Sequence, residues 1–142
     1  MHSQRLPEEI GDARLLDVKQ LVGDVPPETA YEALLGLGVF ALPWCRACRR
    51  TSFPPRVLCP HCGATGISWL RAAPGGVVYS LSVVHLRNAE PRVVALIDLD
   101  DGPRIMTNLV GAPADAFAIG MRVRVQVETR DETPLALFTP EA

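Results

Sequence analysis

Hydrophobic and polar residues alternate with a period of two along much of the C-terminal half of the chain. Residues 121–128 give the clearest example, in which Met and Val alternate with Arg, Gln and Glu. Such alternation is typical of a strand with one buried and one solvated face. Alternation also predicts a strand at 77–83, and β-rich runs predict strands at 93–99 and 105–110. Residues 135–138 are counted as the last of five strands.

Turn-forming residues separate these predicted strands. Asn, Asp, Gly and Pro concentrate at 88–91, 100–103, 111–113 and 131–134. The pair Gly75-Gly76 is expected to form a turn before the first strand. Five short strands within residues 74–142 favour a small closed barrel over a sandwich, because closure removes the edges that an open five-stranded sheet would expose.

The first 40 residues have a helical pattern instead. An amphipathic stretch over residues 15–22 predicts one helix, and a second is expected to begin near Pro26 and to end at Gly36 or Gly38. Helices this short are marginal in isolation. Residues 1–40 are therefore predicted to dock, either on the rest of the chain or on a partner.

All four cysteines lie between these regions, in residues 41–73. They form two pairs, Cys45-Arg-Ala-Cys48 and Cys59-Pro-His-Cys62. Two CxxC pairs can supply the four thiolates of a tetrahedral zinc site, and four protein ligands leave no open position for a substrate. The spacing therefore predicts a structural zinc site that uses all four cysteines.

The sequence disfavours disulfide bonds and a redox dithiol as roles for the cysteines, but it leaves an iron site open. Disulfides are not expected in a chain without an export signal, and a redox dithiol would sit at a helix start in an α/β context. Iron stays open, because Cys-Pro-x-Cys-Gly also resembles a rubredoxin knuckle and tetrahedral sulfur suits both metals. The second knuckle continues into Gly63, whereas Arg49 occupies the equivalent place in the first, which predicts a turn that is either strained or differently shaped.

Length and charge narrow the functional classes. A chain of 142 residues suits one domain with a small appendage, and it has no run of about 18 apolar residues, so a cytoplasmic protein without a membrane partner is expected. The formal net charge of −2 demands no polyanionic partner. However, residues 33–89 contain no Asp or Glu and carry Arg46, Arg49, Arg50, Arg56, Arg71 and Arg87.

In this order, the motifs resemble a known family. The helical N-terminus, CxxC, Phe53-Pro54-Pro55-Arg56, CPxCG and Gly75-Gly76-Val77-Val78-Tyr79-Ser80 are similar to domain-of-unknown-function family thirty-five, over roughly residues 28–140. Members combine a rubredoxin-like zinc ribbon with an OB-fold barrel. The resemblance therefore implies a mainly β fold with N-terminal helices, a ribbon and a five-stranded OB-fold barrel. The chain departs from the family at Arg49, where glycine is usual.

The resemblance also implies a function. Such proteins are accessory subunits of thiolase-like enzymes that act on acyl-CoA or acyl groups, among them thiolases, acyltransferases and aldolases. They bridge subunits and help to form the passage for CoA or the acyl group. This chain is accordingly expected to be a non-catalytic subunit of a hetero-oligomer with a thiolase-fold enzyme.

The residues themselves offer little for catalysis, and no catalytic residue is predicted. All four cysteines are committed to metal. His85 and Asp98 could be drawn as a base and its orienting group, but a lone strand histidine is more typical of a surface or packing role.

Binding is the better hypothesis. Four arginines flank the cysteines, and their guanidinium groups match the phosphates of CoA, although solvation or contact with an acidic partner explains them as well. These are Arg46, Arg49, Arg50 and Arg56. Phe53 is expected to pack between ribbon and barrel, with partner contact as the alternative.

The main rival function is single-stranded nucleic-acid binding, which both ribbons and OB barrels perform. From Gly75 onward the chain has six arginines against nine carboxylates, and its aromatic residues are only Tyr79, Phe117 and Phe138. A negatively charged barrel with so few rings is a poor surface for phosphates and bases. A second rival, electron transfer by iron, predicts a red protein.

Overall fold

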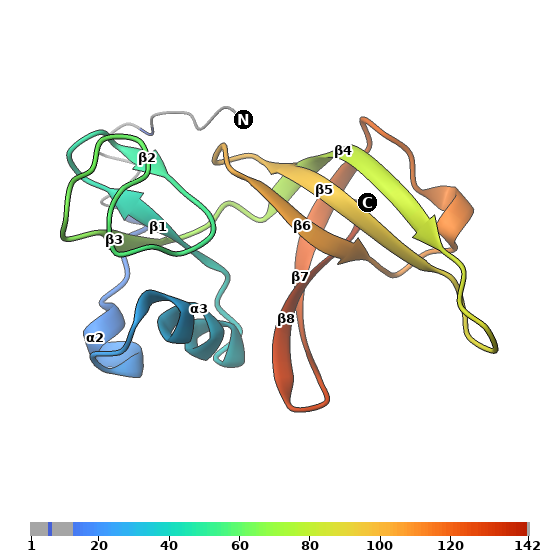
Figure 1. Ribbon diagram of the computed structural model, residues 1–142, viewed down its shortest axis with the longest axis horizontal. Coiled ribbons are helices and arrows are strands. Elements are labelled where there is room, and N and C mark those ends of the chain that lie inside the picture. The colour runs from blue at the N-terminus through green and yellow to red at the C-terminus, as the bar shows by residue number, and fades with distance from the viewer. Residues whose placement is uncertain (1–5, 7–12, 142) are drawn as a thin grey trace.

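Two β-structures lie side by side in the molecule (Figure 1). The computed structural model describes residue 6 and residues 13–141. A three-stranded sheet, which we call the ribbon sheet, comes first, and in it β1 (Ala41–Cys45) lies between β2 (Arg50–Thr51) and β3 (Ser68–Arg71). A closed barrel of order β4-β5-β6-β8-β7 follows it. The fold class expected from the sequence, a ribbon region followed by a five-stranded barrel, is confirmed. The precise boundaries of the three predicted segments stay a prediction.

The five barrel strands coincide with the runs of alternating residues. They are β4 (Gly75–Val84), β5 (Arg92–Leu99), β6 (Arg104–Leu109), β7 (Arg122–Arg130) and β8 (Thr133–Pro140). Neighbouring strands are antiparallel except for β6 and β8, which pair in parallel and close the barrel together with β4 and β7. Every strand of the barrel is thus paired on both sides.

Inward-facing residues of these strands form the barrel core. Val78, Ile97, Val123 and Phe138 come from different strands and are at most 1% exposed. The ring of Phe40, which lies just before the ribbon sheet, packs edge to face on Phe138 with centroids 6.2 Å apart. The chain before the ribbon therefore contributes to the core of the barrel that follows it.

The first predicted helix begins later than expected. Helix α2 spans only Val18–Val22, and the Asp17 side chain accepts a hydrogen bond from the backbone N–H of Gln20. Leu15 forms a β-bridge with Leu70, so the helical assignment of residues 15–17 was wrong. Among the described residues, no helix is long and apolar enough to cross a membrane.

Helix α3 (Pro27–Gly36) docks on the rest of this chain, between the ribbon and β8 (Figure 1). Its residues Ala30 and Leu34 pack with Trp69 of the ribbon region, whereas Leu35 belongs to the barrel core. The Tyr31 ring lies 5.3 Å from that of Phe53. The helix thereby holds the two β-structures against each other.

Gly75 and Gly76 lie inside β4, so the turn expected there was wrong. A Cβ on Gly76 would stand 2.6 Å from Cγ2 of Ile97 and 2.8 Å from the carbonyl oxygen of Asp98. Glycine is required here because β5 passes too close for a side chain.

We expect Gly76→Ala to lower the free energy of unfolding by about 1–3 kcal/mol, because β4 and β5 must separate to admit the methyl group. Urea denaturation measures the change. Gly36→Ala is the control: its Cβ meets nothing within 4 Å and alanine favours a helix, so stability should stay level or rise. Equal stability of the two variants would contradict the close-approach argument.

Candidate metal centre

The ribbon sheet positions the first cysteine pair. Strands β1 (Ala41–Cys45), β2 (Arg50–Thr51) and β3 (Ser68–Arg71) form it, with Cys45 opposite Arg50 at one end. Sequence reasoning recognised the knuckles but missed this sheet. All five residues of β1 are buried, so the strand shows no alternation of apolar and polar residues that could have revealed it.

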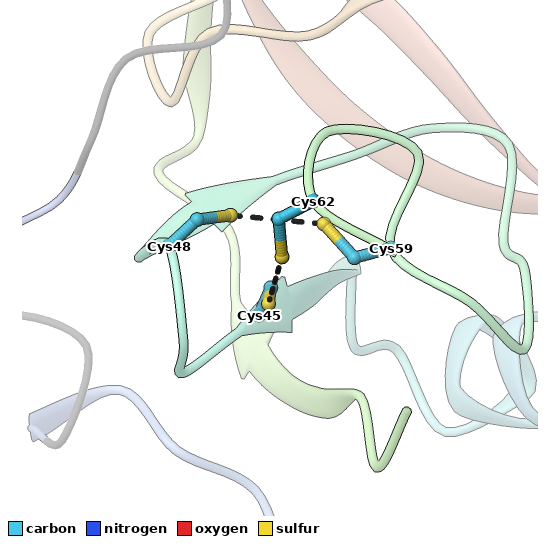
Figure 2. A group of neighbouring side chains, drawn as sticks. All are labelled: Cys45, Cys48, Cys59 and Cys62. Carbon is cyan, nitrogen blue, oxygen red and sulfur yellow. Dashed lines mark hydrogen bonds between the residues drawn. The ribbon is translucent and has the colours of Figure 1, made fainter. Parts of the chain in front are cut away.

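The four cysteine sulfurs converge on one point, and the structure brings all the predicted ligands together (Figure 2). The Sγ atoms of Cys45 and Cys62 lie 3.6 Å apart, those of Cys48 and Cys59 lie 3.7 Å apart, and all four lie within 4.8 Å of one another. A tetrahedron with metal–sulfur bonds of about 2.3 Å has edges of about 3.8 Å. The four sulfurs therefore fit a single tetrahedral ion.

Backbone amides favour the thiolate form of one ligand. Burial opposes ionisation of Cys59, but hydrogen bonds from the backbone N–H groups of His61 and Cys62 outweigh it and lower the pKa of this thiol to about 7. Burial and hydrogen bonding with Cys59 raise the pKa of Cys48 to about 12. Cys59 is therefore suited to ionise ahead of Cys48 when a cation arrives.

The two knuckles have the same backbone turn. Gly63 has φ of 78° and its N–H donates to the carbonyl of Cys59, while Arg49 has φ of 60° and its N–H donates to the carbonyl of Cys45. Of the two possibilities raised by the sequence, the first knuckle is strained rather than differently shaped. A left-handed conformation costs a residue with a Cβ about 1–2 kcal/mol.

We expect Arg49→Gly to hold the metal more tightly than Arg49→Ala. Both variants lack the guanidinium group, so the difference isolates the backbone strain, and about 1 kcal/mol corresponds to roughly fivefold in affinity. Competition with a chromogenic chelator measures it. Equal affinities for the two variants would show that the turn carries no strain that matters for metal binding.

A buried carboxylate connects the ribbon to the other parts of the chain. Asp101, in the turn between β5 and β6, accepts two hydrogen bonds of 3.0 Å from the guanidinium of Arg14 and one of 2.8 Å from the N–H of Ala73. Its carbonyl accepts from the Thr51 hydroxyl, and the Thr51 carbonyl lies 3.2 Å from Nε2 of His61 in the second knuckle. Sequence reasoning missed this residue, because Asp-Asp-Gly-Pro shows only turn chemistry.

The four candidate phosphate-binding arginines do not share one hollow. Arg46 lies beside the ring of Trp44 at 5.8 Å and lines a hollow of about 510 Å³. Arg56 lines an adjoining hollow of about 320 Å³, and Lys19 lines both. Arg49 is exposed and Arg50 half-buried. Lys19 is a cation at this surface that the sequence interpretation did not name.

Phe53 lies between ribbon and barrel. It is half-buried, packs against the barrel core and meets Tyr31 of α3. This is the packing role that the sequence indicated for it, whereas contact of Phe53 with a partner stays a prediction.

The structure does not bring His85 and Asp98 together as a catalytic base and its orienting group. Asp98 lies opposite Val77 near the start of β4, whereas His85 follows the other end of that strand and is exposed. His85 lies eight positions after Val77, the residue opposite Asp98, which is about 26 Å along an extended strand. Asp98 instead holds the guanidinium of Arg104, with Nε 2.6 Å from Oδ1.

A zinc ribbon joined to an OB-fold barrel is the class that this fold and site define. Residues 38–68 match the family described as ChsH2, rubredoxin-like zinc ribbon domain, and residues 69–128 match ChsH2, C-terminal OB-fold domain. A chain of the Ltp2-ChsH2(DUF35) aldolase superposes with a TM-score of 0.73 and 34% identity, over 82% of this chain and 96% of that one. The chain belongs to the DUF35 family, the domain-of-unknown-function family thirty-five indicated by its motifs.

Curated relatives are similar over part of their length. The chain is 41% identical over 101 residues to a probable enoyl-CoA hydratase alpha subunit of Thermomonospora curvata, covering 68% of this chain and 32% of the relative. It is 30% identical over 87 residues to a DUF35 domain-containing scaffold protein of Methanothermobacter thermautotrophicus, covering 57% of this chain and 65% of the relative. The chain thus spans about a third of the first relative and just under two thirds of the second.

Proposed function

We propose that the chain is a non-catalytic accessory subunit of a thiolase-fold acyl-CoA enzyme, which it joins in a hetero-oligomer. The observation that carries the proposal is the likeness to the DUF35 chain of an aldolase over nearly all of that chain's length. The names of the relatives, a scaffold protein and a hydratase subunit, agree with an accessory role. In the assembly the chain bridges subunits and helps to bind CoA or the acyl group.

The described residues support a role in binding rather than in catalysis. The four cysteines form one cluster, so no described thiol is left over as a nucleophile. The His85 and Asp98 pair is separated by the length of a strand. Chemistry on a thioester therefore belongs, in this proposal, to the partner subunit.

We further propose that the cluster holds structural zinc. Cys45, Cys48, Cys59 and Cys62 would hold the ion, which fixes the two knuckles relative to each other and has no open position at which to activate water. Iron is distinguished by colour and by elemental analysis. One zinc per colourless chain is expected, and a red protein would contradict zinc.

We also propose that the arginines near the cysteines contact the phosphates of CoA. Arg46 and Arg56 line adjoining hollows that share Trp69 and Ile67 in their walls, so an extended anion could touch both. Arg49 and Arg50 lie on the first knuckle and line neither of these two hollows. Guanidinium groups suit such phosphates because they donate paired, charge-assisted hydrogen bonds.

Nucleic-acid binding is disfavoured by the barrel's own ion pairs. Arg104 pairs with Asp98, Arg122 with Asp100, and Arg130 with Glu128. Half of the six barrel arginines are thus neutralised within the chain. A surface whose cations are already paired follows a phosphate backbone poorly.

Purification of the tagged full chain from its native cells tests the proposed function. A thiolase-fold enzyme subunit should co-purify in stoichiometric amount, and the isolated chain should leave acyl-CoA thioesters intact. Thioester turnover by the chain alone, or tight retention of single-stranded oligonucleotides, would overturn the proposal.

A further inference from the structure

Two aliphatic side chains protrude from the ribbon next to an arginine. Between the buried Pro55 and the buried ligand Cys59 stand Arg56, Val57 and Leu58, all exposed. Val57 is 68% exposed and Leu58 51%. We name residues 56–58 the ribbon tip. The two adjacent aliphatic side chains present apolar surface that contact with a partner would remove from water.

The ribbon tip is held at both ends. On one side, the Phe53 ring packs against Tyr31 and the barrel core. On the other, the N–H of Cys59 donates to the carbonyl of Ala64, and the carbonyl of Cys59 accepts from Gly63. A three-residue segment anchored so closely loses little conformational entropy when it binds, which favours affinity.

Two hollows adjoin the ribbon tip. One of about 320 Å³ is lined by Arg56 and Val57 together with Trp69, and the other, of about 250 Å³, is lined by Arg56 with Phe53 and His61. Arg56 lines both hollows and Val57 lines the larger one, so the ribbon tip borders each of them. A rigid aliphatic projection with hollows beside it is the shape of an anchor that enters a groove on another protein.

The charge around the tip indicates the character of that groove. The hollow beside Val57 is lined by two cations, Lys19 and Arg56, against one carboxylate, Asp24, and residues 33–89 as a whole hold six arginines and no carboxylate. Four thiolates on a divalent cation would add a net charge of −2 to residues 33–89, whose six arginines still leave that stretch cationic. Complementary potentials across an interface therefore call for a partner surface that carries Asp or Glu around an apolar groove.

We propose that the ribbon tip is the docking anchor of this chain, and that Val57 and Leu58 enter an apolar, carboxylate-rimmed groove on the acyl-CoA enzyme subunit. The inference rests on the proposed function and adds a defined contact to it. A metal ion bound by the four cysteines would also position this contact, because it would fix Cys59 and with it one end of the tip.

The test uses the partner subunit recovered with the wild-type chain. Val57→Ser combined with Leu58→Ser should weaken its affinity for the chain at least tenfold, roughly the loss of one hot-spot contact. Arg56→Glu should slow association and reverse its dependence on salt. Ile119→Ser, which removes a residue 69% exposed on the barrel side, is the matched control and should leave affinity unchanged. Metal content and circular dichroism confirm that each variant folds.

The outcomes separate the two proposals. Failure of the wild-type chain to recover any enzyme subunit overturns both. Full affinity of the Val57→Ser/Leu58→Ser variant overturns the tip alone and leaves the accessory function standing. Dimerisation of the isolated chain, or binding to phosphatidylserine vesicles, that is lost in this variant while the subunit still binds would assign the tip to a second copy or to a lipid surface and overturn the proposal.

Discussion

In the presence of a competing chelator, Cys59→Ser should abolish metal retention and unfold the ribbon while the barrel stays folded. Structural zinc supplies roughly 10–16 kcal/mol in small zinc domains, so loss of one of four thiolates should lower affinity by about a hundredfold or more. The ribbon sheet has strands of only five, two and four residues and cannot replace that free energy by packing. The barrel is closed and has its own core.

Tryptophan fluorescence can distinguish unfolding of the ribbon from unfolding of the barrel. Both tryptophans, Trp44 and Trp69, lie in ribbon strands and are buried, and the barrel strands contain none. Tryptophan emission should therefore move towards the red in Cys59→Ser, while amide exchange of the barrel strands stays slow. Elemental analysis after dialysis against a chelator should find no zinc in Cys59→Ser and one zinc per wild-type chain.

Cys62→His is the matched control for this substitution. Zinc accepts three sulfurs and one imidazole, and Cys62 is exposed, so the larger ring has room. This variant should keep zinc and the emission of the native ribbon. Native emission from Cys59→Ser without metal would show that the ribbon folds by packing alone and would contradict the role given to the site.

The barrel could be predicted because its strands alternate buried apolar and exposed polar residues, and this alternation is visible in the sequence. In β7, Val123 faces the core while Arg122 and Arg124 are exposed, and the alternation along the sequence follows directly from that geometry. The metal ligands were equally readable, since CxxC spacing is a local property. In both cases neighbouring residues carry the whole signal.

The rest depends on partners distant in sequence, which no local pattern records. Leu15 lies in a stretch whose sequence pattern predicts a helix, yet it forms a β-bridge with Leu70 of the ribbon sheet. Gly76 resembles a turn glycine, but its role is set by Ile97 across the strand. The arginine run suggested one cationic site, whereas folding distributes Arg46 and Arg56 to adjoining hollows.

Asp101 likewise bonds to residues far away in sequence, Arg14 and Ala73. Asp101→Ala should lower the free energy of unfolding by about 3–5 kcal/mol. Its side chain is 5% exposed and holds the half-buried guanidinium of Arg14 as well as the N–H of Ala73. Removal of the carboxylate leaves both donors without their acceptor inside the structure. Urea denaturation of the full chain measures the loss.

Its sequence neighbour provides the control. Asp100 pairs with Arg122, but both side chains are more than a third exposed, so Asp100→Ala should cost at most about 1 kcal/mol. The double variant Arg14→Ala/Asp101→Ala should recover part of the loss, because no buried cation is then left unpaired. If Asp101→Ala were as mild as Asp100→Ala, the buried pair would not hold the N-terminal segment to the barrel, and α3 with its hydrophobic contacts would carry that attachment alone.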